Sequence, residues 1–275
     1  MVSDLGDSVS GTRFKRCKTI TYIPGRSTVD ATPAVKEIYS KIGTDMKAET
    51  TVKENNEGSV VVSWTGGKDG CFACHKAILE GFDVSYLLNF RDMKKSGSHE
   101  INPELLSLQS EAVGIPILQT NFISYEQEFK KVVRDLKAGG VRVDGAVFGH
   151  IETHKELVDR MCSGLGIKSI LPIWNCSSEQ IITDLIDAGF DAIVISSKSD
   201  LFDEEWLGRK IDKKFLSDLR RFNDAIDPCG EYGEFHTCVL DGPMFEKKLR
   251  IVDSRKILKD GYWFLDILKC TTEEK

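Results

Sequence analysis

The feature that most constrains this fold is a regular alternation of apolar, strand-like runs with amphipathic, helix-like segments. The first run, Ser59–Trp64 (SVVVSW), is rich in β-branched residues, as is typical of a buried parallel strand. Predicted helices and strands then follow one another to about residue 196. Because strands separated by helices form right-handed βαβ units, we predict an α/β fold with a parallel sheet and helices on both faces.

Apolar periodicity and helix-capping residues give the expected boundaries. Strands are expected at residues 59–64, 82–90, 115–120, 143–148, 169–174 and 192–196, and helices at 71–81, 102–113, 125–138, 154–165 and 178–188. Asn102 is suited to cap the second helix, with Pro103 at its first position. Pro172 in the fifth strand indicates a strand at the sheet edge or the end of a strand.

The chain divides into three predicted parts. Residues 1–58 show almost no apolar periodicity, and we predict an N-terminal extension that is partly irregular. Residues 59–200 carry the parallel sheet. Residues 201–275 are expected to form a small C-terminal α+β module, because a stretch rich in glycine, proline and acids there is followed by strand-like alternation.

Composition narrows the class of protein. The chain has 37 Lys and Arg against 43 Asp and Glu, a net charge of −6, which disfavours an electrostatic grip on nucleic acid over the whole surface. We therefore expect no nucleic-acid partner. No apolar run approaches the roughly 18 residues of a bilayer span, and Met1–Ser10 lacks the apolar core of a secretion signal. We expect a cytoplasmic protein whose eight cysteines are free thiols.

The glycine-rich segment Trp64–Gly70 (WTGGKDG) lies between the first strand and the first helix. Gly66 and Gly67 allow a ligand to approach the backbone, and we expect both to take positive φ. Successive amides followed by a helix N-terminus form an anion-binding nest, to which Thr65 adds a hydroxyl and Lys68 a charge. The pattern is neither GxxxxGK[ST] nor GxGxxG. It favours a phosphate or pyrophosphate site, the alternative being an ordinary glycine turn.

A second block, Asp227–Phe245 (DPCGEYGEFHTCVLDGPMF), gathers titratable side chains in the last third of the chain. Its candidates are Glu231, Glu234, His236 and Asp241, and strand alternation places Glu234 and His236 on one face. Carboxylates of this kind bind magnesium or an amine, and a histidine transfers protons near neutral pH. The alternative is a solvated acidic loop.

Other candidates carry weaker signals. Cys71 and Cys74 form a CxxC pair without the second pair of a zinc ribbon, so they are either a thiol or metal pair or two small buried residues on one helix face. His99 is either a surface residue or part of a substrate loop. His150 and His154 are four residues apart, but a strand end there disrupts helical geometry, so we expect no metal pair.

Together the two motifs resemble a known family. The glycine-rich turn resembles the SGGKDS motif of the N-type ATP pyrophosphatases of the PP-loop superfamily, with Thr65 and Gly70 replacing the two serines. The second block is similar to the C-terminal signature of the diphthine–ammonia ligase family, in which a GExGE(Y/F) stretch precedes a strand and a DGP turn. The resemblance covers about Ser59 to Ile267 and implies a Rossmann-like sheet of the adenine nucleotide alpha hydrolase type.

The resemblance also implies a reaction and a set of residues. The implied enzyme is an ATP-dependent amide-forming ligase that adenylates a carboxylate, releases pyrophosphate and transfers ammonia, with ATP and Mg²⁺ as cofactors. The implied catalytic residues are Lys68, Asp69, Glu234 and His236. The implied ATP-binding residues are Thr65, Gly66, Gly67, Lys68, Asp69, Gly70 and Gly149, with Asp69 as the metal ligand. The implied substrate residues are His99, Glu231, Glu234, His236 and Asp241.

Two departures from the family pattern leave the acceptor open. Diphthine ligases usually have glutamate at the position of His236 and an Asp-Tyr-Gln-Arg-like stretch where this chain has residues 149–155 (GHIETHK). These features look more like a sister branch associated with corrinoid metabolism. The acceptor is therefore either translation elongation factor 2 carrying diphthine or a small-molecule carboxylate such as a corrinoid-pathway intermediate.

Two further alternatives concern the reaction itself. One is a thiolating PP-loop enzyme that uses Cys71 and Cys74, and the other is a nucleotide-binding module without turnover. Because no glutaminase-like domain is visible, free ammonia is the expected nitrogen source. A homodimer is compatible with this interpretation.

Overall fold

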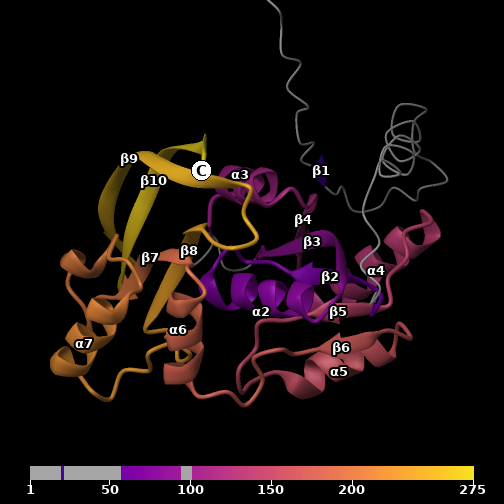
Figure 1. The fold of residues 1–275 in the computed structure, drawn as a ribbon, viewed down its shortest axis with the longest axis horizontal. Coiled ribbons are helices and arrows are strands. Elements are labelled where there is room, and N and C mark those ends of the chain that lie inside the picture. The colour runs from indigo at the N-terminus through magenta and orange to yellow at the C-terminus, as the bar shows by residue number, and fades with distance from the viewer. Residues whose placement is uncertain (1–19, 22–56, 94–100) are drawn as a thin grey trace, which may run out of the picture.

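Two β-sheets stand side by side in the computed structural model, which describes residues 20–21, 57–93 and 101–275 (Figure 1). Most of the predicted extension and His99 lie outside the described residues. The first sheet has the strand order β1-β4-β3-β2-β5-β6, and its pairings are all parallel. Its strands are β1 (Ile20–Thr21), β2 (Ser59–Ser63), β3 (Asp83–Asp92), β4 (Ile117–Phe122), β5 (Gly145–Val147) and β6 (Lys168–Ile170).

Helices cover both faces of this sheet, as predicted. The described helices are α2 (Lys68–Leu79), α3 (Pro103–Val113), α4 (Tyr125–Ala138), α5 (Lys155–Ser163), α6 (Ser178–Asp187) and α7 (Lys213–Phe222), with a short 3₁₀ turn η2 (Glu204–Trp206). Val60 and Val62 pack in the core beneath α2 and α3, whereas Val61 packs with α4 and α5 on the other face. This alternation explains why the centre of β2, Val60 to Val62, is apolar: both faces of the strand are buried.

Local signals fix several of these boundaries. The side chain of Asn102 accepts a hydrogen bond from the Glu104 amide at 2.9 Å and so caps α3, and Gly114 ends that helix with a φ of 76°. β6 is an edge strand and ends at Ile170, two residues before Pro172, in agreement with the sequence prediction.

The strand order creates a crevice where the site can form. β2 lies between β3 and β5, so the connections leave β2 in one direction along the sheet and later return to its other side. In open α/β sheets, ligands bind at such a switch point, beyond the carboxyl ends of the strands. The glycine-rich turn follows β2 and Gly149 follows β5, so both lie at this crevice.

The second sheet is antiparallel and has the order β8-β7-β10-β9. Its strands are β7 (Asp191–Lys198), β8 (Phe235–Asp241), β9 (Lys247–Lys259) and β10 (Tyr262–Glu274). β7 corrects the sequence prediction, which placed this strand last in the parallel series. A short buried apolar run fits a parallel sheet and the centre of an antiparallel sheet equally well, so periodicity could not separate them. The second sheet thus takes in β7 besides elements of the predicted module at 201–275.

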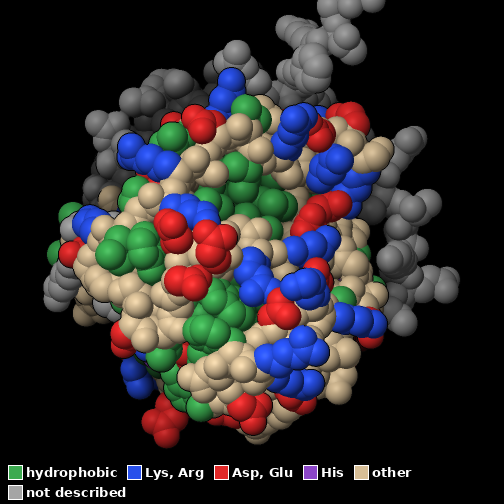
Figure 2. Space-filling view, turned by 90° about the vertical axis from the view of Figure 1, so that its left-hand side faces the viewer, with side chains coloured by type: hydrophobic (Ala, Val, Ile, Leu, Met, Phe, Trp, Pro, Cys, Tyr) green, Lys and Arg blue, Asp and Glu red, His purple; other side chains and the backbone are tan. Residues whose placement is uncertain are grey.

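The two sheets share one hydrophobic core. α2 contacts β8, and α3 contacts β9 and β10, so these helices lie between the first sheet and the second. The end of the molecule formed by the second sheet carries Lys and Arg interspersed with Asp and Glu around apolar side chains (Figure 2). Cross-strand ion pairs such as Arg250–Glu273 and Arg255–Asp266 connect β9 to β10. Among the described residues, no helix has both the length and the hydropathy of a bilayer span.

Candidate active site

The glycine-rich turn adopts a conformation that requires its glycines for two different reasons. Gly66 has a φ of 77°, and a Cβ there would lie 2.5 Å from Oε1 of Gln109. Gly67 has a φ of −85°, which corrects the expectation of positive φ at both positions. A Cβ at Gly67 would lie 3.2 Å from the carbonyl oxygen of Thr237, so this glycine allows β8 to approach closely.

Helix α2 begins at Lys68, directly after the turn, and its N-terminus is open to an anion. The N-cap residue is Gly67, which has no side chain to accept from the amides of the first turn. The Lys68 amide instead donates to the Thr237 hydroxyl at 3.1 Å. Gly149 lies against the same turn of helix, because a Cβ there would be 2.7 Å from the Gly70 nitrogen. The structure thus brings Gly149 to the predicted phosphate site.

Gly70 replaces the last serine of the PP-loop motif, and packing does not impose the change. A Cβ at this position would lie 3.5 Å from the Ser63 carbonyl oxygen, an ordinary contact distance. Thr65 is exposed at the start of the turn. One hydroxyl of the motif is therefore retained beside the helix N-terminus, and the other is absent although the position has room for a Cβ.

Lys68 is a buried cation, with only 2% of its surface exposed. Its ammonium group donates to Oδ2 of Asp69 at 2.9 Å and to the carbonyl oxygen of Cys229, and it lies 5.6 Å from the centre of the Phe235 ring. Burial lowers the pKa of Lys68, but the charge of Asp69, its hydrogen bond to Lys68 and the nearby Cys229 and Glu231 side chains together outweigh this effect, so the net pKa is raised. Lys68 therefore keeps its charge in a poorly hydrated position, where a phosphate would interact with it strongly.

Asp69 fits the role of a magnesium ligand. Its Oδ1 atom is buried and has no hydrogen-bond partner among the described residues. A free carboxylate oxygen is a hard ligand of the kind that Mg²⁺ prefers, and Mg²⁺ is commonly bound by one or two carboxylates together with substrate phosphates and water. The described residues contain no group of three or more His, Cys, Asp or Glu arranged to hold a metal ion, so Asp69 would share such an ion with the phosphates.

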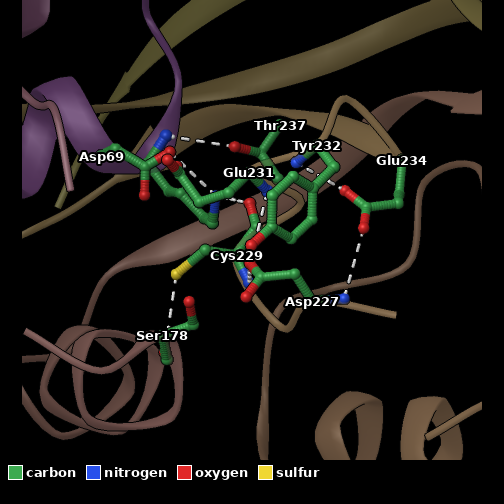
Figure 3. A network of polar contacts seen from close by, with 9 residues as sticks. Asp69, Ser178, Asp227, Cys229, Glu231, Tyr232, Glu234 and Thr237 are labelled. Atoms are coloured by element: carbon green, nitrogen blue, oxygen red, sulfur yellow. Dashed lines mark hydrogen bonds and ion pairs between the residues drawn. The ribbon is translucent and has the colours of Figure 1, made fainter. Parts of the chain in front are cut away.

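The acidic block forms a loop whose shape is set by its own carboxylates (Figure 3). Asp227 accepts hydrogen bonds from the amides of Cys229 and Glu231, at 2.8 and 3.3 Å. The carboxylate of Glu234 is buried and accepts from the Tyr232 amide at 2.9 Å. In Figure 3, Glu234 lies at the opposite end of the network from Asp69. In the structure, the Glu234 carboxylate is therefore hydrogen-bonded to the backbone of its own loop.

Glu231 is the carboxylate of this loop that lies beside the turn (Figure 3). Burial, reinforced by the negative charge of Asp69, raises the pKa of Glu231 to about 7, although Lys68 opposes the shift. The site thus joins Lys68 and Asp69 from the start of α2 to Glu231 from the loop before β8.

The other predicted residues of the block lie farther along β8. Phe235 and Thr237 contact Lys68, so His236, which alternates with them, points to the opposite face of the strand. Asp241 ends β8 and pairs with the ammonium group of Lys275 at 2.6 Å. These positions neither support nor contradict a role in substrate binding, which stays a prediction for His236 and Asp241.

The surroundings of Cys71, Cys74, His150 and His154 indicate structural roles for these paired residues. Cys71 and Cys74 are fully buried; burial raises the pKa of Cys71 well above its usual value and that of Cys74 to about 12. Both thiols are therefore protonated at neutral pH and are weak nucleophiles. His154 is the N-cap of α5, and its ring stacks on that of His150 at 5.3 Å. Burial lowers the pKa of His150 to about 4.

Sequence reasoning missed three contributors to the site. Gln109, Thr237 and the Cys229 carbonyl all contact the turn or Lys68. A backbone carbonyl leaves no sequence signal, and a threonine in a strand is ordinary. Gln109 did leave one: it follows Leu105 by four residues and Leu106 by three, so it lies on the apolar face of α3.

Comparison with known proteins finds two family domains in this chain. Residues 58–169 match the diphthamide synthase N-terminal domain, and residues 177–272 match the diphthamide synthase C-terminal domain. A diphthine–ammonia ligase of Danio rerio is 24% identical over 246 residues, which is 77% of this chain and 95% of that protein. One of Schizosaccharomyces pombe is 27% identical over 222 residues, 70% of this chain but 36% of that larger protein.

Among solved structures, a 4-thiouridine synthetase–RNA complex with bound ATP overlaps 48% of this chain and 41% of its own, at 16% identity and a TM-score of 0.36. The two matched domains follow one another in the chain and together contain the turn at Lys68 and the loop at Glu231. This chain belongs to the diphthamide synthase, or diphthine–ammonia ligase, family.

Proposed function

We propose that this protein is a cytoplasmic ATP-dependent ligase that converts a substrate carboxylate to an amide, as the names of its diphthine–ammonia ligase relatives suggest. The observation that carries the proposal is the juxtaposition of two motifs. The turn with Lys68 and Asp69, suited to phosphate, meets the loop with Glu231, which belongs to the family's C-terminal signature. One motif would hold ATP, and the other would face the acceptor.

In the proposed first step, an oxygen of the substrate carboxylate attacks the α-phosphorus of ATP. The bond from that phosphorus to the bridging oxygen breaks, and pyrophosphate leaves. Backbone amides of Gly67 and Gly70 would hold the leaving group at the N-terminus of α2. Lys68 would contribute its third N–H donor, since Asp69 and Cys229 accept two. Bound through Asp69, Mg²⁺ would supply charge neutralisation on the phosphates.

In the proposed second step, ammonia attacks the carbonyl carbon of the acyl-adenylate. The carbon–oxygen bond to AMP breaks, and the nitrogen loses a proton as the amide forms. Glu231 lies beside the turn and would face this reaction, while Glu234 would maintain the loop. The paired cysteines argue against a thiolating reaction, because buried protonated thiols are poor sulfur carriers.

The identity of the acceptor is tested by giving the purified protein ATP, ammonium and each candidate in turn. The candidates are elongation factor 2 carrying diphthine and small-molecule carboxylates, including corrinoid-pathway intermediates. We expect pyrophosphate and the amide of elongation factor 2 to form together, detected by enzymatic assay and mass spectrometry. Amide formation on a small carboxylate alone would assign the chain to the second acceptor class. ATP binding without pyrophosphate release from any of them would contradict ligase activity.

Replacing Lys68 by methionine tests the phosphate site. Lys68→Met keeps the length of the side chain but removes a charged contact to phosphate, and we expect pyrophosphate release to fall at least about tenfold. Lys76→Met is the matched control, because Lys76 lies on the same helix near its far end, and it should retain full activity within about twofold. Unchanged release by Lys68→Met at saturating ATP would rule out the proposed site.

Two isosteric variants separate the carboxylates of the loop. Glu231→Gln removes a titratable carboxyl beside the turn, so we expect acceptor-dependent turnover to fall about tenfold and the ATP dissociation constant to change less than about threefold. Glu234→Gln leaves an amide oxygen to accept from the Tyr232 amide, and the predicted loss of turnover is smaller. If Glu234→Gln were the more damaging change, Glu234 rather than Glu231 would be the acceptor-side carboxylate.

A further inference from the structure

The side-chain amide of Gln109, a buried residue, forms hydrogen bonds to the glycine-rich turn. Gln109 lies on α3 and is completely buried. Its Nε2 donates to the carbonyl oxygen of Gly66 at 2.9 Å and to that of Val239 in β8 at 2.8 Å. Its Oε1 accepts from the indole N–H of Trp64 at 3.1 Å. Gln109 therefore connects the end of β2, the turn and the second sheet.

This arrangement is more than a filled space in the core. α3 presents Leu105, Leu106 and Ala112 on the same buried face, where an apolar side chain would avoid the cost of desolvating an amide. Both N–H donors and the oxygen of Gln109 are nevertheless used. A fully paired amide fixes the relative positions of its partners more narrowly than apolar contact does.

Fixing the Gly66 carbonyl also fixes the neighbouring amide. The Gly66 carbonyl and the Gly67 N–H belong to one planar trans peptide, so they point in opposite directions. Gln109 holds that carbonyl toward α3, and the Val239 amide donates to it as well, at 3.0 Å. The Gly67 N–H is thereby directed away from α3, into the anion-binding nest of the turn.

We propose that Gln109 is a positioning residue that directs the Gly67 N–H of the phosphate turn and keeps β8 aligned with it. The inference rests on the proposed function, because the group to be positioned is the departing pyrophosphate. Gln109 itself touches no substrate. Its contribution is to hold the geometry that the transition state requires.

The test compares two amide-to-thioether changes around the same helix. Gln109→Met preserves length and volume but removes the hydrogen bonds to Gly66, Val239 and Trp64. Gln119→Met is the matched control, because Gln119 of β4 also donates two bonds to α3, to the Pro103 carbonyl and the Ser107 hydroxyl, both at 3.0 Å, and neither involves the turn. Thermal unfolding identifies folded protein in each preparation.

Steady-state kinetics with saturating acceptor then measure kcat and the KM for ATP. For Gln109→Met we expect kcat to fall at least about tenfold and KM to rise by less than about fivefold, since misalignment affects the transition state more than ground-state binding. Gln119→Met should keep kcat within about twofold of wild type, even if its melting temperature falls as much as that of Gln109→Met. A kcat for Gln109→Met within about twofold of wild type would overturn the inference.

Gln109→Glu provides a second variant if the methionine variant does not fold. Burial keeps such a carboxyl neutral, so it can accept from Trp64 and donate one of the two lost bonds. If Gln109→Met folds, we expect the kcat of Gln109→Glu to lie between those of Gln109→Met and wild type. If Gln109→Met does not fold, we expect the kcat of Gln109→Glu to be below that of wild type. A wild-type kcat for Gln109→Glu would overturn the inference.

Calorimetric titration with ATP separates this inference from the proposed function. Absence of pyrophosphate release by the wild type would refute the proposed function but not the positioning. In that case an ATP dissociation constant raised at least about threefold in Gln109→Met, and unchanged in Gln119→Met, would support a role for Gln109 in shaping the turn. Equal constants in both variants would overturn it.

Discussion

The site depends on the docking of an edge strand onto a glycine-rich turn. β8 is one of the two outer strands of the second sheet, and an outer strand has unpaired backbone groups on one side. Here those groups form hydrogen bonds with the part of the chain that carries the parallel sheet: the Val239 amide donates to the Gly66 carbonyl, and the Val239 carbonyl accepts from Gln109. The contact protects the edge of the sheet and at the same time fixes the turn. Gly67 makes this approach possible because a side chain there would press on β8.

Burial of polar groups is the second consequence of this docking. Lys68 loses almost all contact with water, and its charge is retained because Asp69 and the Cys229 carbonyl lie against its ammonium group. The loop that supplies Cys229 is held by Asp227 and Glu234, whose carboxylates accept its amides. Ordering of the acidic loop and placement of the lysine are therefore coupled. That coupling provides a physical route by which the proposed acceptor side of the site and the proposed ATP side would influence one another.

The sequence predicted those parts that depend on local rules. Asn102 caps α3, and the turn after β2 carries its signature in consecutive glycines, a lysine and an aspartate. β7 was assigned to the wrong sheet because an apolar run buried on both faces has the same pattern in either one. The Glu234 carboxylate, predicted to be catalytic, lies on its own loop, a distinction that composition cannot make. The contacts of Gln109 span more than a hundred residues of sequence, so only the fold reveals them.

Adenylation of the acceptor is the central claim, and isotope transfer tests it most directly. An acceptor whose carboxylate carries ¹⁸O is incubated with the protein, ATP and ammonium, and the nucleotide product is analysed by mass spectrometry. If the carboxylate attacks the α-phosphorus, the labelled oxygen stays with phosphorus when ammonia displaces the nucleotide, so AMP gains one ¹⁸O. Formation of unlabelled AMP, or of ADP and phosphate in place of AMP and pyrophosphate, would contradict the account.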